Sequence, residues 1–235
     1  MKLKTTVVIL VGALTSVAWA ADSSTNLNNE TDKISYAIGA QMGQDFKQQN
    51  ISINAVSFSQ GLQDSLSGVK TKMDQVQIQE TLNNFRKKII EKKQAEYKAL
   101  SDENKKQGEK FLTENKSKSG VVTLPDGLQY KITKAGAGVQ PQEGDSVTVN
   151  YSGKFLDGKE FDSSYQRGKP ATFVLSKDLI PAWVEVLQKM KAGTTVELYV
   201  PASLGYGDRG VGPIGPNQML TFKIELLSVK KGEKK

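Results

Sequence analysis

The chain has 235 residues, with 32 Lys and Arg against 25 Asp and Glu, a formal net charge of +7 at pH 7, and neither His nor Cys. Without imidazole or thiol groups it can form no Ser-His-Asp or Cys-His nucleophile system, no His or Cys zinc site and no disulfide. Any catalysis must therefore use carboxylates, hydroxyl groups, Lys or a metal held by oxygen ligands, or it must involve no covalent chemistry.

Residues 1–20 have the features of a secretory signal peptide. Two lysines precede an apolar run over residues 7–17, and small residues at 18 and 20 supply a cleavage signal. A buried or membrane-spanning helix is the alternative, but the apolar run is shorter than the roughly 20 residues that a bilayer requires. We expect cleavage before Ala21, a periplasmic, secreted or cell-surface location, and no integral membrane segment in the mature chain.

Residues 21–73 are predicted to form a small helical module. From Thr31 to Gln49 apolar side chains recur every three or four residues, and Asn54 opens a second short helix that Gly68 closes. A segment this small lies near the lower limit for independent folding, so we expect it to pair with a second copy and form a homodimer. The alternative is that these helices pack on the C-terminal domain of their own chain.

A long connecting helix is predicted within residues 74–118. Asp74 and Gln77 have the spacing of a capping box at its start. Beyond Glu91 helix formers are frequent and apolar residues few, a pattern typical of a helix that crosses solvent between domains. Gly108 weakens the middle by about 1 kcal/mol relative to alanine and is a candidate bend.

The same helix carries most of the basic excess of the chain. Residues 86–118 contain 11 Lys or Arg and 6 Asp or Glu. A basic helix is compatible with nucleic-acid binding, but acidic side chains are interspersed along this one, and an exported chain does not meet nucleic acid. We therefore predict a solvated helix and no nucleic-acid partner.

The periodicity changes from helical to alternating over residues 119–230. Apolar and polar residues alternate at 147–151 and again at 220–226, and one short helix is predicted over 181–190. The expected fold class is α+β, with a C-terminal antiparallel sheet wrapped around one short helix, preceded by the long helix and the all-α dimerisation module. Residues 231–235 form a basic tail.

Seven short motifs follow one another in this domain. In chain order they are Tyr151-Ser-Gly, Phe161-Asp162-Ser-Ser, Arg167-Gly-Lys-Pro, Ile180-Pro-Ala-Trp183, Leu204-Gly-Tyr206-Gly, Ile214-Gly-Pro and Phe222. Together they resemble the FKBP-type peptidyl-prolyl cis-trans isomerases. The preceding signal peptide, helical module and long helix resemble the Mip-like (macrophage infectivity potentiator-like) branch of that family, whose members are V-shaped homodimers.

The activity that this resemblance implies suits a chain without His or Cys. Rotation of an X-Pro bond needs no nucleophile, because only the partial double bond of the amide, with a barrier of about 18 to 20 kcal/mol, must be weakened. A dry apolar pocket that binds the twisted amide more tightly than the planar one lowers this barrier. The resemblance implies an isomerase of proline-containing polypeptides that needs no cofactor or metal. We add the hypothesis of chaperone activity, and the rival is a chaperone, adhesin or proline-peptide binder without catalysis.

The same resemblance implies how the pocket is built. Trp183 forms the floor, beneath the proline ring of the substrate. Five further side chains supply the walls: Tyr151, Phe161, Leu179, Ile180 and Phe222. Macrolides that fill this pocket are implied inhibitors.

Polar groups complete the implied site. The backbone N–H of Ile180 and the hydroxyl of Tyr206 bind substrate carbonyls, and Ile214 lines the rim. Asp162 lies beside the twisting amide, where Arg167 holds it.

Three positions depart from the commoner family pattern. Ala182 replaces the usual glycine before the tryptophan, and Val211 lies near a position where other members have histidine. Ala171 replaces an aromatic wall found in some members, which widens the pocket and predicts a changed substrate preference with activity retained.

Overall fold

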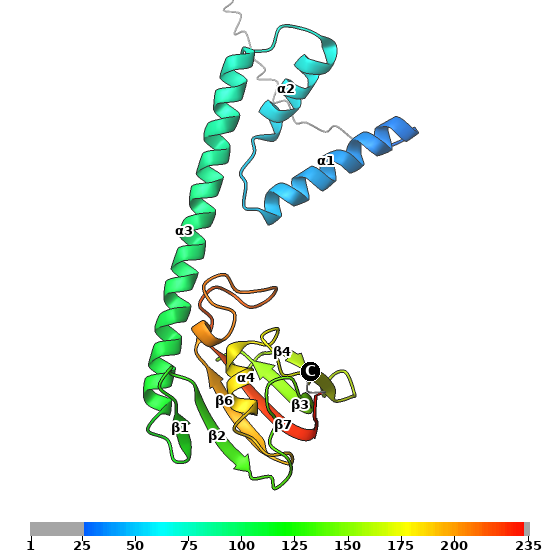
Figure 1. Cartoon of the computed structure of the whole chain (residues 1–235). Coiled ribbons are helices and arrows are strands. Elements are labelled where there is room, and N and C mark those ends of the chain that lie inside the picture. The colour runs from blue at the N-terminus through cyan, green and yellow to red at the C-terminus, as the bar shows by residue number, and fades with distance from the viewer. Residues whose placement is uncertain (1–25, 233–235) are drawn as a thin grey trace, which may run out of the picture. The chain divides into compact units, whose positions relative to one another are not determined.

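The computed structural model describes residues 26–232 (Figure 1). The predicted signal peptide, residues 1–20, and the last three residues of the predicted tail lie outside this range. The chain divides into two compact units between Ile78 and Gln79. Within the described range, no helix combines the length and the apolar character needed to cross a bilayer.

The first unit contains two helices close to the predicted ones. Helix α1 spans Glu30–Gln48 and α2 spans Ala55–Ser67. Each begins after an asparagine, Asn29 or Asn54, whose side-chain oxygen accepts a hydrogen bond from the backbone N–H three residues later. Gly68 ends α2 with a φ of 69°, a left-handed conformation that favours glycine.

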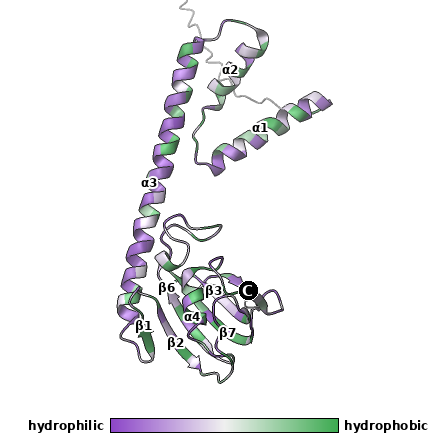
Figure 2. Ribbon diagram, viewed as in Figure 1, coloured by the Kyte–Doolittle hydropathy of each residue, from purple (hydrophilic) through white to green (hydrophobic). Residues whose placement is uncertain are grey.

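The apolar residues of this unit are largely exposed. Helix α1 has no buried residue, and side chains such as Ile38 and Leu62 keep more than half of their surface accessible. The rings of Phe46 and Phe58, 6.3 Å apart in an edge-to-face arrangement, join the two helices. Figure 2 shows these hydrophobic positions distributed along both. Within residues 26–78 the predicted apolar stripes therefore lack a partner that covers them.

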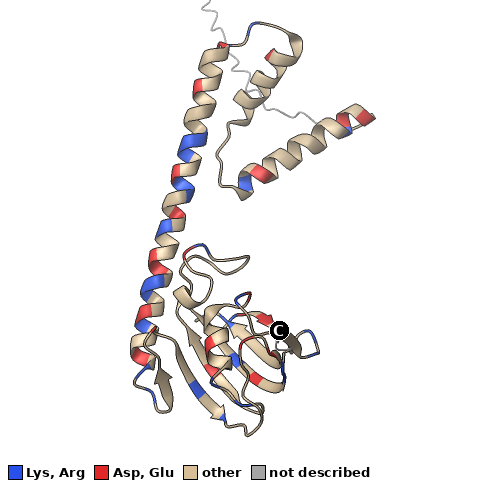
Figure 3. Ribbon diagram, in the orientation of Figure 1, with Lys and Arg blue, Asp and Glu red and all other residues tan. Residues whose placement is uncertain are grey.

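Helix α3 spans Gln75–Asn115, so it begins one residue after the start of the predicted range 74–118 and ends three residues before its end. Its start is the predicted capping box, because Gln77 N donates to Asp74 Oδ1 over 2.8 Å and Asp74 N donates to Gln77 Oε1 over 2.9 Å. Positive and negative side chains alternate along the helix (Figure 3). Gly108 does not interrupt it and is buried.

The expectation that α3 crosses solvent is wrong for its C-terminal part. Asn115 is 1% exposed and donates from Nδ2 to Gln129 Oε1 over 3.0 Å. Gln129 Nε2 in turn donates to the carbonyl oxygen of Leu112 over 2.8 Å. The Phe111 ring lies 5.7 Å from that of Tyr199. The docked face is mainly polar, which is why the hydrophobic pattern did not reveal it.

The second unit contains one seven-stranded antiparallel sheet with the order β1-β2-β6-β7-β3-β4, in which β5 pairs with β3. Its strands are β1 (Val121–Thr123), β2 (Gln129–Lys134), β3 (Ser146–Lys154), β4 (Glu160–Ser163), β5 (Ala171–Val174), β6 (Thr195–Val200) and β7 (Leu220–Lys230). The central strands β3 and β7 alternate between buried and more exposed residues, as the period of two requires when one face is covered.

Helix α4, Pro181–Leu187, covers one face of this sheet (Figure 1). Val186 and Leu187 are fully buried against sheet residues that include Ile224. The helix ends three residues before the predicted Met190, because the N–H groups of Lys189 and Met190 bond to carbonyls three residues back, as in a tighter turn. The architecture is the α+β fold expected from the sequence.

Candidate functional site

A cavity of about 220 Å³ opens where the N-terminus of α4 meets the sheet. It is lined by ten residues: Tyr151, Phe161, Asp162, Phe173, Asp178, Leu179, Ile180, Trp183, Tyr206 and Phe222. Eight of these are residues to which the sequence assigned a role, and the other two are Phe173 and Asp178. Side chains spread over 72 positions of the chain, from Tyr151 to Phe222, thus come together around one hollow.

Strand register brings the walls together. Tyr151 on β3 pairs with Ile224 of β7, and two residues along each strand Gly153 pairs with Phe222, so Tyr151 and Phe222 lie on the same face of the sheet. A Cβ atom at Gly153 would lie 2.7 Å from the Phe161 ring and 2.8 Å from the Phe222 ring. Only glycine leaves room for both rings, whose centroids are 5.7 Å apart.

Trp183 is the centre of an aromatic cluster. Its ring centroid lies 5.0 Å from that of Tyr151 and 5.6 Å from those of Phe173 and Phe222, with interplanar angles of 83° to 90°. Edge-to-face packing of this kind fixes the indole plane. The residue is 5% exposed, and its Nε1 has no hydrogen-bond partner among the described residues. The floor is therefore a rigid and mostly apolar surface.

Asp162, Tyr151 and Arg167 form a closed set of hydrogen bonds at the edge of the cavity. The Tyr151 hydroxyl donates to Asp162 Oδ2 over 2.5 Å, and Arg167 Nη2 donates to the Tyr151 oxygen over 2.7 Å. Arg167 Nη1 also pairs with Asp162 Oδ1. The guanidinium carbon lies 5.3 Å from the centroid of the Tyr151 ring. Arg167 does not line the cavity and acts on it through the other two.

This arrangement determines the protonation of the site. Burial acts to raise the pKa of Asp162, but the hydrogen bonds from Tyr151 and Arg167 and the guanidinium charge outweigh it, so the pKa lies below its usual value. Burial, together with the hydrogen bond to Asp162, raises the pKa of Tyr151. Burial and the charge of Asp162 raise the pKa of Tyr206. Asp162 is consequently ionised at neutral pH and both phenols keep their protons.

Ile180 occupies the residue just before α4. Its carbonyl accepts from the N–H groups of Trp183 and Val184 over 3.0 and 3.3 Å, while Pro181 occupies the first helical position. Among the described hydrogen bonds, the Ile180 N–H donates to none. The residue that carries this N–H is one of those that line the aromatic cavity.

The structure does not place Ile214 on the rim. Val211 and Ile214 exchange two backbone hydrogen bonds of 2.9 Å, and this tight turn directs Ile214 into the core, where it is 5% exposed. Val211, the other residue of this pair, is 58% exposed. The departure at Ala182 is accommodated, since its side chain is fully buried in the first turn of α4.

Phe173 and Asp178 were missed by the sequence interpretation. Phe173 could have been predicted from its spacing. It lies two residues after Ala171 on β5, so both side chains are on the same face of the strand, and both are partly buried. Its ring, 6.2 Å from that of Tyr151, supplies an aromatic wall near the smaller Ala171. Asp178 lies in the loop before α4 and had no comparable signal.

Comparison with known proteins agrees with this geometry. Residues 138–227 match the family model of the FKBP-type peptidyl-prolyl cis-trans isomerase, and residues 31–132 match that of the domain amino terminal to it. The chain belongs to the FKBP-type isomerase family. The expected family and enzyme activity are thereby confirmed, and this FKBP-type protein is a peptidyl-prolyl cis-trans isomerase.

Its relatives match it over nearly the whole length. The chain is 48% identical to the outer membrane protein MIP of Legionella longbeachae, covering 98% of this chain and 99% of that protein. It is 46% identical to the peptidyl-prolyl cis-trans isomerase Mip of Coxiella burnetii, over 90% and 92% of the two chains. The crystal structure of FkpA from Escherichia coli is similar, with 35% identity, a TM-score of 0.71, and coverage of 86% of this FKBP-type chain and 98% of that one.

Proposed function

We propose that the cavity above Trp183 is the isomerase site. The observation that carries this proposal is the convergence of Tyr151, Phe161, Asp162 and Trp183 on one aromatic hollow. Its lining also includes Ile180, whose backbone N–H makes none of the described hydrogen bonds. An apolar floor favours a pyrrolidine ring and disfavours the water that solvates a planar amide.

The chain's own groups suffice for the reaction. With the proline ring on Trp183, the Ile180 N–H and the Tyr206 hydroxyl bind two substrate carbonyls and hold the peptide while the X-Pro bond turns. Asp162 keeps a negative charge beside the twisting carbonyl, because Arg167 and Tyr151 stabilise its ionised form. Such fixed charges favour the twisted amide over the planar one, since they need no reorganisation as the bond rotates.

The test is a protease-coupled isomerisation assay on an X-Pro peptide. Asp162→Ala and Tyr206→Phe should each lower kcat/KM by about 10-fold or more, as expected for loss of one group that stabilises the transition state. Tyr165→Phe is the matched control, because Tyr165 is 50% exposed and does not line the cavity. Full activity in both site variants would place the reaction elsewhere.

We also propose that residues 21–73 form a homodimerisation module. The apolar side chains of α1 and α2 are exposed within their own unit, and residues 31–132 match a family model for the domain that precedes the isomerase. Ile38→Glu combined with Leu62→Glu should convert a dimer into a monomer in sedimentation experiments, because each change puts a charge on an apolar contact surface. Gln63→Glu on α2 is the control. A wild-type chain that sediments as a monomer at micromolar concentration would refute the proposal.

We also propose a chaperone activity that does not depend on isomerisation, carried by the apolar side chains of α1 and α2 that the dimer contact leaves exposed. Exposed apolar patches of this extent are typical of sites that hold other polypeptides. Asp162→Ala should then suppress aggregation of a denatured protein as well as the wild type does. A variant that loses both activities together would contradict two separate functions.

We propose export through the signal peptide at residues 1–20 to the periplasm or cell surface. The Legionella longbeachae relative is named an outer membrane protein. N-terminal sequencing of the mature protein should begin at Ala21. A mature protein that retains Met1 would overturn this assignment.

A further inference from the structure

Three polar side chains of α3 bind the segment that carries Tyr206. Tyr97 donates from its hydroxyl to the carbonyl oxygen of Asp208 over 2.6 Å. Asn104 Nδ2 donates to the carbonyl oxygen of Pro216 over 2.8 Å, and Ser101 Oγ accepts from Asn217 Nδ2 over 2.8 Å. We call the segment from residue 205 to residue 217 the Tyr206 loop. Spacings of four and three residues place Tyr97, Ser101 and Asn104 on one face of the helix.

These contacts lead to the isomerase cavity through the backbone. Asn217, held by Ser101, donates its own N–H to the carbonyl oxygen of Gly207 over 2.9 Å. Gly207 directly follows Tyr206, whose side chain lines the cavity. Asn217 has a φ of 50°, a conformation in which asparagine is enriched among residues other than glycine. The path from Ser101 to Tyr206 therefore passes through Asn217 and Gly207 and includes two hydrogen bonds.

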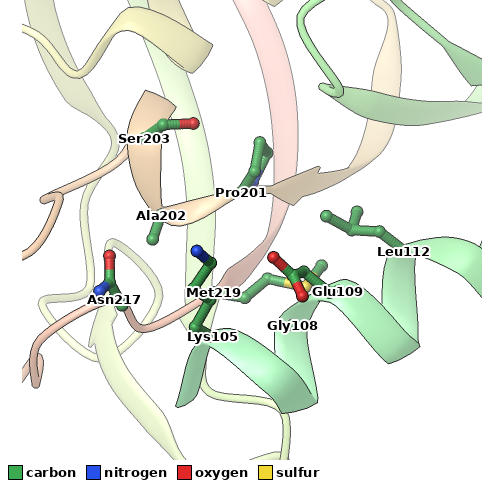
Figure 4. Close-up of a pocket in the computed structure, with 9 residues that line it drawn as sticks. All are labelled: Lys105, Gly108, Glu109, Leu112, Pro201, Ala202, Ser203, Asn217 and Met219. Atoms are coloured by element: carbon green, nitrogen blue, oxygen red, sulfur yellow. The ribbon is translucent and has the colours of Figure 1, made fainter. Parts of the chain in front are cut away.

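Apolar contacts accompany these hydrogen bonds. A Cβ atom at Gly215 of the loop would lie 3.7 Å from Leu100 Cδ2. Further along α3, Gly108 lies close to Met219. A Cβ atom at Gly108 would be 3.1 Å from Met219 Cβ. Beside this contact is a cavity of about 320 Å³ between α3 and the segment that joins β6 to β7. Figure 4 shows Gly108 and Glu109 on the helix across the cavity from Ala202 and Ser203. Because packing is incomplete there, the polar contacts determine the register of the loop on the helix.

We propose that Tyr97, Ser101 and Asn104 are positioning residues for catalysis: through the Tyr206 loop, α3 sets the place of the Tyr206 hydroxyl in the isomerase cavity. This inference rests on the proposed role of Tyr206 at that site. None of the three side chains lines the cavity, so their effect on the substrate is indirect. One wall of the active site is thus positioned by a helix that lies outside the sheet.

The test uses the full-length protein with Ser101→Ala and Asn104→Ala combined. Loss of two hydrogen bonds that place a catalytic wall should lower kcat/KM for X-Pro peptides by about 3- to 10-fold. The ranking of peptides with Ala, Leu or Glu before proline should also change. Amide hydrogen exchange should become faster over residues 202–218 and stay unchanged in β3 and β7. Asn84→Ala, which gains the same helix propensity as Asn104→Ala elsewhere on α3, should leave all of these unchanged.

Two further variants separate positioning from stability. Ser101→Thr keeps the hydroxyl acceptor and should retain wild-type kcat/KM. In a Tyr206→Phe background the double alanine change should cost less activity than it does in the wild type, because the group it positions is already absent. Equal costs in both backgrounds, or unchanged kcat/KM in the double variant with Tyr206→Phe still impaired, would overturn the inference and leave the proposed site intact. Unchanged activity in Tyr206→Phe itself would instead remove Tyr206 from the proposed site, and the inference with it.

Discussion

Gly153 offers the sharpest test of how the proposed isomerase cavity is built. Its φ is not positive, so an alanine there meets a purely spatial obstacle. The added methyl would lie 2.7 Å from Phe161 Cζ and 2.8 Å from Phe222 Cε1, well inside the ordinary contact distance of 3.5 to 4.0 Å between carbon atoms. Both rings must therefore shift by nearly 1 Å, away from the position that completes the wall around Trp183.

The expected magnitude follows from the cost of overpacking. Insertion of one methyl group into a packed region costs about 1 to 3 kcal/mol, so Gly153→Ala should lower the free energy of unfolding of the C-terminal unit by this amount. Displaced walls should also lower kcat/KM by about 10-fold, since misplacement of about 1 Å in a site is sufficient for losses of up to 10²-fold. In a chain that begins at Ala21, Trp183 is the single tryptophan, so its fluorescence follows urea unfolding of this unit directly.

A second substitution serves as the control. Phe161→Leu removes the ring atom nearest to the new methyl, so the cost of Gly153→Ala should fall by about 0.5 to 2 kcal/mol in that background. The relief is partial because Phe222 remains. A Gly153→Ala protein that is as stable and as active as the wild type would show that the two rings do not meet over Gly153, and the described wall would be incorrect.

Three further predictions concern charge and ligand binding. For end-blocked peptides, kcat/KM should be constant from about pH 5 to 9, because the pKa of Asp162 lies below its usual value and that of Tyr206 above; a bell-shaped profile centred near pH 7 would contradict the assignment. Hydrogen bonds from Lys231 and two backbone N–H groups lower the pKa of Asp145 to about 2. Its ionised form therefore stabilises the fold above about pH 4, and this contribution is lost as the pH falls towards 2. Urea unfolding should show Asp145→Asn less stable than the wild type at pH 6, with the difference decreasing below pH 4; a difference that does not depend on pH would refute this reading. A macrolide that inhibits the enzyme should change the emission of Trp183, and inhibition without any change would place the inhibitor in another pocket.

The grouping of the aromatic residues around one cavity was largely predictable, because aromatic residues in an ordered set of motifs have few alternative uses. Phe161, Trp183 and Phe222 are individually ordinary core residues, and only their order along the chain indicated a common pocket. Helix bounds were also predictable where a specific hydrogen bond defines them, as at Asp74 and Asn54. Helix α4 ends where the N–H groups of Lys189 and Met190 bond to carbonyls three residues back, a backbone change without a side-chain signal, and there the prediction extended three residues too far.

The docking of α3 was not predictable from hydrophobic periodicity. Apart from Phe111, the contacts named on its docked face come from Tyr97, Ser101, Asn104, Gly108 and Asn115, which are polar or neutral although two of them are buried. The missed signal was the recurrence of uncharged residues at helical spacing in a segment otherwise rich in Lys and Glu. Ile214 was misplaced for a related reason, since the turn that directs it inward depends on two backbone hydrogen bonds that its side chain does not encode.

The side-chain amide of Gln129 bears on where a catalytic fragment should begin. Gln129 is 2% exposed, and its two partners, Asn115 and the carbonyl group of Leu112, both belong to α3. A fragment cut at Ser119 would lose both hydrogen bonds, at a cost of about 0.5 to 1.5 kcal/mol each. A fragment that starts ahead of Tyr97 would keep the amide paired and the helix docked, and is the better choice for crystallisation with inhibitors.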